Sequence, residues 1–179
     1  YIRKEKKPGC EIASREKRDQ VYKAFLDMLN ISPKHLGQLV RAGVRPGMIL
    51  EKQYKTVPDF KSRWKYAKKL IQMGFSLEGI PGFYQAEANG RTFWTFAARE
   101  GMIIPVRDLD GFITGLRIRL DKPELKPNGE EKRKYRWFSS AGLLMGTSSG
   151  TSCHVARGSP DEVWVTEGEK KSDVACDIT

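Results

Sequence analysis

The spacing of apolar residues predicts a series of short helices in the first part of the chain. Ser14 is a suitable N-cap, and apolar side chains recur after it every three or four residues, as in an amphipathic helix, until Asn30. Ser32-Pro33 then predicts the start of a second helix, with Gly43 as its stop. A short helical turn is expected after Pro46.

Two of the predicted helices have an apolar face that should pack inward. In the second helix this face consists of Leu36, Leu39 and Val40. Pro58-Asp59 predicts the cap of a further helix, which should end at Gly74. Its buried stripe is expected to consist of Phe60, Trp64, Ala67, Leu70 and Ile71.

A period of two replaces the helical spacing in the second part of the chain, which indicates strands. Asn89-Gly90 predicts a tight turn between two short aromatic strands. Residues 102–106 and 112–120 are predicted to form a hairpin, and residues 134–138 a further strand. The charged segment 121–133 is expected to be a mobile loop.

The second hairpin strand carries the first candidate binding residues. Its alternation places Arg117 and Arg119 on the same face, and Gly115 lets a ligand or a backbone approach closely. Guanidinium groups suit phosphate because their donors match two oxygen atoms at once.

Each of these basic positions also has an ordinary structural interpretation. The hairpin face could be solvated, with Arg107 paired to Asp108 or Asp110. Lys134-Tyr135 offers a point charge and a ring to a nucleotide, or a lysine that protects an edge strand.

The first two helices allow a further alternative, a helix-turn-helix. Their connection is short, and the second helix carries Lys34, Gln38 and Arg41. A plain two-helix packing unit is favoured, because no cluster of base-reading residues stands out.

The last segment holds the sharpest single candidate, Glu167. It follows the apolar residues Val163-Trp164-Val165, which are predicted to form a strand, and it precedes Gly168 and a helix. Ligands and metals tend to bind at the carboxyl ends of strands in α/β folds. A carboxylate at this place should be buried or half-buried and should need a metal, a basic group or a reacting hydroxyl as partner. The alternative, an acid that stabilises a helix N-terminus, explains Glu169 better than Glu167.

Composition and charge add a candidate partner. The chain has 179 residues and a net charge of +10. Such an excess favours an anionic partner, most commonly nucleic acid, although a protein that is merely basic fits the number about equally well.

Few residues of this chain could bind a metal or form a framework of disulfide bonds. Cys10, Cys153 and Cys176 are widely spaced, which predicts free thiols and a cytoplasmic location. Cys153-His154 has poor spacing for zinc ligands, so no metal site is expected in this chain. No run of residues is long and apolar enough to span a membrane.

Four elements in order resemble the catalytic core of bacterial-type primases. They are Pro105-Val106-Arg107-Asp108 with Gly111, Gly115 and Arg119, then Lys134-Tyr135 with Ser139, then Glu167-Gly168. The resemblance covers residues 80–177 and is closest to the primase-like TOPRIM proteins of phages, plasmids and integrative elements.

The resemblance implies an α+β fold. A helical N-terminal subdomain would precede a mixed, largely antiparallel sheet and the first strand and helix of a TOPRIM α/β fold. The implied boundaries are 1–13 for an arm or linker, 14–78 for the helical subdomain, 79–160 for the strand-rich subdomain and 161–179 for the start of the TOPRIM domain.

The resemblance also implies roles for individual residues. Arg119, Lys134 and Tyr135 match a basic ridge that holds the template–primer hybrid or the incoming nucleotide. Arg107 matches the Pro-x-Arg-Asp position of the hairpin. Glu167 matches the TOPRIM glutamate, which lies beside the metal site and acts in proton transfer or metal organisation.

The sequence departs from the family at several places. Leu116-Arg117-Ile118 stands where the family usually has small residues, and Arg136-Trp137-Phe138 replaces the family's Leu-Asn. The later Asp-x-Asp that binds Mg²⁺ in TOPRIM domains has no counterpart after Glu167. The chain is therefore expected to be a fragment that binds nucleic acid and does not catalyse or bind a metal tightly by itself.

The implied parent protein would synthesise RNA primers with Mg²⁺ or Mn²⁺. Its expected partners are single-stranded DNA, the RNA–DNA hybrid and nucleoside triphosphates, and a replicative helicase is a further candidate. Two alternatives stay open: a TOPRIM nuclease or topoisomerase-like enzyme, and a non-catalytic nucleic-acid-binding module of a replication protein.

Overall fold

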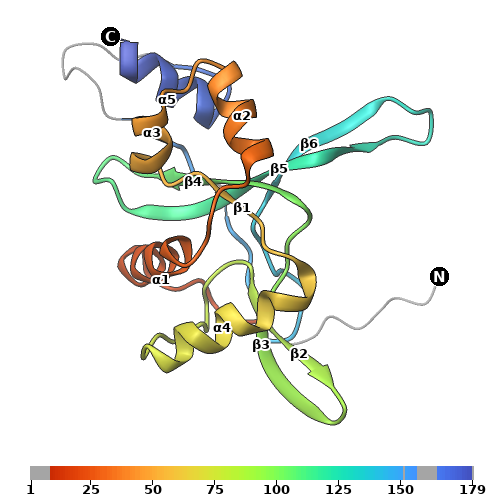
Figure 1. Ribbon diagram of the computed structural model, residues 1–179. Coiled ribbons are helices and arrows are strands. Elements are labelled where there is room, and N and C mark those ends of the chain that lie inside the picture. Colours follow the sequence, from red (N-terminus) through yellow and green to blue (C-terminus); the bar gives the residue numbers. More distant parts are fainter. Residues whose placement is uncertain (1–8, 151, 157–164, 179) are drawn as a thin grey trace.

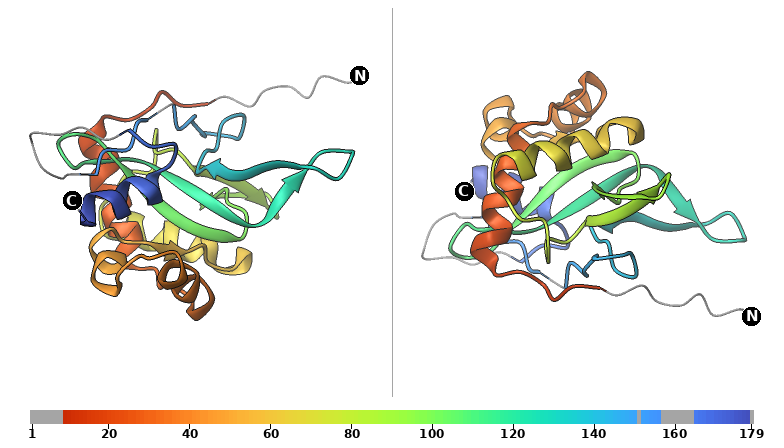
Figure 2. Two further views of the ribbon diagram at one scale, coloured as in Figure 1. Left: turned by 90° about the horizontal axis from the view of Figure 1, so that it is seen from above. Right: turned by 90° about the horizontal axis from the view of Figure 1, so that it is seen from below.

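An antiparallel sheet lies between two groups of helices in the computed structural model, which describes residues 9–150, 152–156 and 165–178 (Figures 1 and 2). The helices are α1 (Arg15–Asp27), α2 (Pro33–Arg41), α3 (Pro46–Glu51), α4 (Arg63–Gln72) and α5 (Glu169–Ile178). The strands are β1 (Lys55–Thr56), β2 (Phe83–Ala88), β3 (Arg91–Phe96), β4 (Gly101–Arg107), β5 (Ile113–Leu125) and β6 (Glu131–Trp137). The predicted α+β fold with largely antiparallel sheets is confirmed.

The central sheet has the order β1-β4-β5-β6, and β2 and β3 form a separate hairpin within the described residues. The β4–β5 register pairs Ile103 with Ile118 and Met102 with Arg119. Since neighbouring residues of a strand face opposite ways, Ile103 and Ile118 enter the larger core with α1 and α4, whereas Met102 enters a second core with α2 and α3. Figure 1 shows α2, α3 and α5 above the sheet and α1 and α4 below it.

Four phenylalanines lie at the centre of the larger core. Their rings come from α1, β2, β3 and the segment after β6, and they belong to Phe25, Phe83, Phe96 and Phe138. Each ring contacts the other three, with centroid separations between 5.1 and 5.9 Å. The helical first part and the strand-rich second part therefore share one hydrophobic core.

Local signals of the sequence fix the ends of several elements. The Ser14 hydroxyl accepts from the Lys17 amide, and the Ser32 hydroxyl accepts from the His35 amide, so both predicted N-caps are confirmed. Asn89-Gly90 has positive φ at both residues, as a tight turn between β2 and β3 requires.

The predicted inner faces of α2 and α4 are partly wrong. Leu36 and Val40 are 39% and 49% exposed, whereas the neighbouring His35 is buried between Thr56 and Asp121, with its ring nitrogens 2.7 and 2.8 Å from their oxygens. Hydrogen bonds from distant elements therefore bury His35 and leave Leu36 and Val40 at the surface.

The same exchange occurs in α4 and the turn before it. Phe60 is 73% exposed, and Trp64 and Ile71 are exposed as well. Arg63 is buried instead and donates to the carbonyl oxygens of Pro58 and Ala98.

The charged segment 121–133 is more ordered than the predicted loop. β5 runs on to Leu125 and pairs with β6, while its pairing with β4 ends at Leu120. Residues 121–134 thus form a two-stranded projection, which we call the β5–β6 arm (Figure 1).

The predicted closing strand lies mostly outside the described residues, which exclude Val163 and Trp164. Val165 is exposed, and α5 begins at Glu169. No helix in the described ranges is both long enough and apolar enough to cross a bilayer.

The tight contact of Gly82 with the aromatic core gives a stability prediction. Gly82 has φ +91°, and a Cβ there would lie 2.1 Å from the Phe138 ring. We expect Gly82→Ala to lower the free energy of unfolding by about 2 kcal/mol or more, from backbone strain and displaced packing. Chemical denaturation measures this change. Gly47→Ala is the control, because a Cβ at Gly47 meets nothing within 4 Å, and an equal loss in both variants would contradict the account.

Candidate nucleic-acid interface

Arg117 lies against two aromatic rings on the β5–β6 surface. Its guanidinium carbon is 5.3 Å from the centroid of the Tyr135 ring and 5.2 Å from that of Trp137. The register pairs Arg117 with Trp137 and Arg119 with Tyr135, which confirms that the two arginines share a face. Gly115 allows this packing, because a Cβ there would lie 3.3 Å from the Trp137 ring.

The buried carboxylate at the start of α5 is Glu169 and not Glu167. Glu169 is buried, and its Oε1 lies 2.6 Å from Arg117 Nη1. Glu167 has a 79% exposed side chain and pairs with Lys171, whose hydrogen bond lowers the pKa of the Glu167 carboxyl. The expectation of a buried or half-buried Glu167 is therefore wrong, while its catalytic role stays a prediction.

Positive charges gather around the first turn of α5. Burial lowers the pKa of the Lys170 ammonium group, and neighbouring positive charges lower it further. These charges belong to Arg119, Lys134 and Lys171, and we call the four residues the cation cluster. Like charges held close together destabilise one another, so an anion bound here would be stabilised by all of them.

A pocket of about 280 Å³ opens beside the cation cluster. It is lined by Arg117, Tyr135 and residues 167–171. Arg119 is held at the edge of this region by a 2.8 Å hydrogen bond from its Nη1 to Gln38 Oε1 on α2. Arg119, Lys134 and Tyr135, which the resemblance assigns to one ridge, are thus close together, and Arg117 lies beside them.

Arg107 is placed apart from this group. Its guanidinium donates to the Lys52 carbonyl and to Gln53 Oε1, at 3.2 and 3.0 Å. Burial lowers the pKa of the Arg107 guanidinium. A binding role for Arg107 stays a prediction, but its donors are directed into the protein.

A buried network, which we call the Asp173 network, fastens α5 to the rest of the fold. Asp173 accepts hydrogen bonds from the Tyr54 hydroxyl at 2.5 Å and from His154 Nε2 at 3.0 Å. His154 Nδ1 accepts from the Arg107 amide at 3.1 Å, so Nε2 carries the proton that Asp173 receives. Burial raises the pKa of the Tyr54 hydroxyl, and the nearby Asp173 carboxylate raises it further, so Tyr54 stays a donor.

The sequence predictions missed Asp173, Tyr54 and His154. The signal that could have found Asp173 is its spacing, because it lies four residues after Glu169 and shares its helical face. Tyr54 and His154 carry no comparable local signal, since α5 meets them only in the folded chain.

Polar residues of α2 contact protein, which fits the two-helix packing unit better than a helix-turn-helix. Lys34 Nζ lies 2.8 Å from Asp121 Oδ2, and Gln38 accepts from Arg119. Of Lys34, Gln38 and Arg41, the first two therefore contact protein, while Arg41 is exposed.

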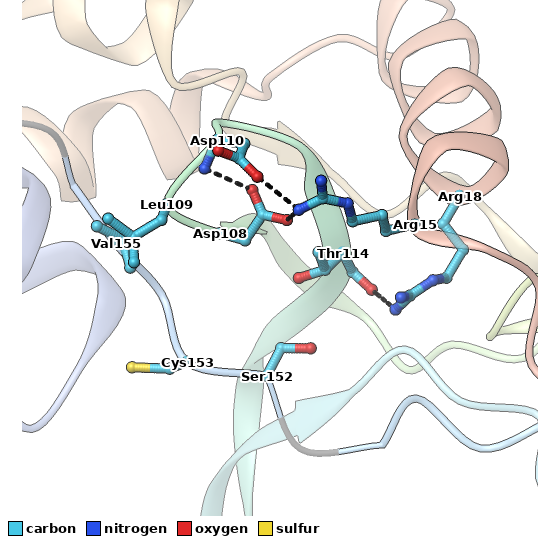
Figure 3. Close-up of a pocket in the computed structure, with 9 residues that line it drawn as sticks. All are labelled: Arg15, Arg18, Asp108, Leu109, Asp110, Thr114, Ser152, Cys153 and Val155. Atoms are coloured by element: carbon cyan, nitrogen blue, oxygen red, sulfur yellow. Dashed lines mark hydrogen bonds and ion pairs between the residues drawn. The ribbon is translucent and has the colours of Figure 1, made fainter.

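A second pocket, of about 370 Å³, lies between α1, the β4–β5 turn and residues 152–155 (Figure 3). Arg15 Nη1 lies 2.6 Å from Asp110 Oδ2 and 3.4 Å from Asp108 Oδ2. Arg15, rather than Arg107, is thus the partner of the turn carboxylates. Arg18 donates to the Thr114 carbonyl on the same wall, so the positive charges here are matched by acids and acceptors.

The residues present do not form a metal centre in the part of the chain that the structure describes. No three Asp, Glu, His or Cys side chains gather there as ligands. Asp108 and Asp110 pair with Arg15, and Glu169 pairs with Arg117.

Comparison with known proteins supports the fold. No protein-family model and no curated protein matches the sequence. The chain is similar to the RNA polymerase domain of Mycobacterium tuberculosis primase DnaG, solved with a double-stranded DNA oligomer that has a 6-nucleotide overhang. The TM-score is 0.51 at 13% identity, over 74% of this chain and 41% of that one. The fold is therefore primase-like.

A second solved structure is also similar, the Aquifex aeolicus primase with its zinc-binding and RNA polymerase domains. Its TM-score is 0.49 at 13% identity, over 74% of this chain and 32% of that one. The chain thus spans less than half the length of either primase structure.

The Asp173 network gives a prediction for α5. Asp173→Ala removes the acceptor of two buried donors, and each unpaired donor costs about 1–3 kcal/mol. We expect faster amide hydrogen exchange throughout residues 169–178.

The matched control is Asp177→Ala on the same helix, because Asp177 pairs with the exposed Arg45 at the surface. Its amide exchange should stay unchanged. Equal exchange in both variants would show that the Asp173 network does not hold α5.

Proposed function

We propose that this chain is the nucleic-acid-binding part of a primase-like protein. The observation that carries the proposal is that aromatic rings share one face of a primase-like fold with Arg119, Lys134 and Lys170, which form no ion pair within the described residues. Aromatic rings can stack on bases, and basic side chains hold phosphates. The M. tuberculosis domain with a similar fold was solved in complex with DNA, which supports the same assignment.

The residues have distinct roles in this proposal. Arg119, Lys134 and Lys170 would neutralise backbone phosphates, which relieves the repulsion within the cation cluster. Tyr135 would present its ring or hydroxyl to a nucleotide. The Arg117 guanidinium lies over the Tyr135 and Trp137 rings with its Nη1 on Glu169, so it would hold a phosphate with its other terminal nitrogen.

The parent protein would use the bound strand as a template. We propose that it synthesises RNA primers on single-stranded DNA with Mg²⁺ or Mn²⁺, from nucleoside triphosphates, and that it belongs to the TOPRIM proteins of mobile elements. The RNA–DNA hybrid is its product, and a replicative helicase is a candidate partner. Glu167, which lines the pocket, would supply one carboxylate to the active site of that protein.

Single-strand binding tests the proposal. Arg119→Gln/Lys134→Gln should weaken binding of a fluorescent single-stranded oligonucleotide at least about fivefold. The slope of log K against log salt should become shallower by about 1.4, since each phosphate contact on a single strand contributes about 0.7. Fluorescence anisotropy across a salt series measures both quantities.

The control removes the same charge from the opposite layer of the protein. Lys68→Gln/Lys69→Gln changes exposed residues of α4 and should leave affinity and slope nearly unchanged. If the two double variants lose affinity equally, net charge rather than this face governs binding. If neither loses affinity, the proposed interface is wrong.

A further inference from the structure

The β5–β6 arm is a second charged feature, beyond the interface described above. Past Leu120, β5 pairs with β6 alone, and the ribbon extends away from the helices (Figure 1). Five more residues of β5 at about 3.3 Å each give the ribbon a reach of roughly 16 Å. It buries little apolar surface of its own, since Leu125 is 60% exposed.

Most acids of the arm form ion pairs with nearby cations. Asp121 pairs with Lys34 and His35 of α2, both at 2.8 Å. Glu124 lies 2.7 Å from Arg136 Nε and 3.4 Å from Arg99 Nη1. These contacts fix the base of the arm to the core.

Of the two remaining acids of the arm, one is paired. Glu130 pairs with Lys126 at 2.9 Å, and Glu131 has no ion-pair partner among residues 9–150, 152–156 and 165–178. Glu131 is therefore the acid of the arm that is unpaired within the described residues.

Three cations of the arm have no such partner, whereas Lys126 pairs with Glu130. Lys122 on β5, and Lys132 and Arg133 on β6, are exposed and form no ion pair within the described ranges. Both strands of the ribbon therefore carry free positive charge. Lys134, on β6 at the base of the arm, belongs to the cation cluster, so the arm continues the proposed interface.

The dimensions of the arm match duplex DNA better than a single strand. The major groove of B-form DNA is about 12 Å wide and admits a two-stranded β-ribbon. Its walls are two rows of phosphates, which cations on both strands of a ribbon can meet. The major groove of A-form RNA is too narrow and deep for such entry.

We propose that the β5–β6 arm binds duplex DNA by entering its major groove, next to the single-strand interface. This inference rests on the proposed function, which it deepens by adding B-form duplex as a second substrate. The protein would then hold a junction, with the single strand on the cation cluster and the duplex on the arm.

The affinities of the protein for duplex and single-stranded probes test the inference. The variant Lys132→Gln/Arg133→Gln should weaken binding of a blunt DNA duplex about tenfold or more. It should lower the salt slope by about 1.8, at about 0.9 for each phosphate contact on B-form DNA. Binding of a single-stranded oligonucleotide should change less than about twofold, because the cation cluster is intact. The wild type should also prefer the DNA duplex over an RNA duplex of the same sequence.

The control is again Lys68→Gln/Lys69→Gln, which should leave duplex binding unchanged. An unchanged duplex affinity in the arm variant would overturn the inference. So would an equal loss on single strand and duplex, or equal wild-type affinity for DNA and RNA duplexes. A wild type that binds duplex through the arm but binds no single strand would support the arm and contradict the proposed function.

Discussion

Two buried carboxylates on α5 set the geometry on which the candidate interface depends. Glu169 and Asp173 lie one turn apart on the inner face of the helix, and a buried charge without partners would cost several kcal/mol. Arg117 meets the first, and Tyr54 and His154 meet the second. These partners come from β5, the segment before β1 and the loop after β6. Together they fix the position of α5 on the sheet. That position brings Lys170 close to Arg119 and Lys134.

The opposite layer gives this arrangement a rigid base. Four phenylalanines from distant parts of the chain contact one another in the larger core, where α1 and α4 cover the sheet. β5 therefore has a fixed apolar face, represented by Ile118, and its other face is free to present Arg117 and Arg119. The β5–β6 arm leaves the core where this support ends.

Sequence patterns predicted the parts of the fold that local chemistry decides. Ser14, Ser32 and Asn89-Gly90 act within a few residues, so their caps and turn were confirmed. Long-range contacts decided the rest. His35 displaced Leu36 and Val40 from the inner face of α2, because its partners lie on β1 and β5. The shared face of Arg117 and Arg119 followed from strand alternation, whereas the burial of Glu169 in place of Glu167 followed from the path of α5.

The central claim is that the cation cluster around α5 receives nucleic-acid phosphates. The most direct test is the pKa of Lys170, followed by NMR of the side-chain nitrogen in the free protein and with a saturating single-stranded oligonucleotide. Burial and neighbouring cations hold this pKa below the ordinary value of a lysine, and a bound phosphate favours the charged form. The account predicts that the pKa of Lys170 rises when the strand binds. An unchanged or lower pKa in the complex would contradict it.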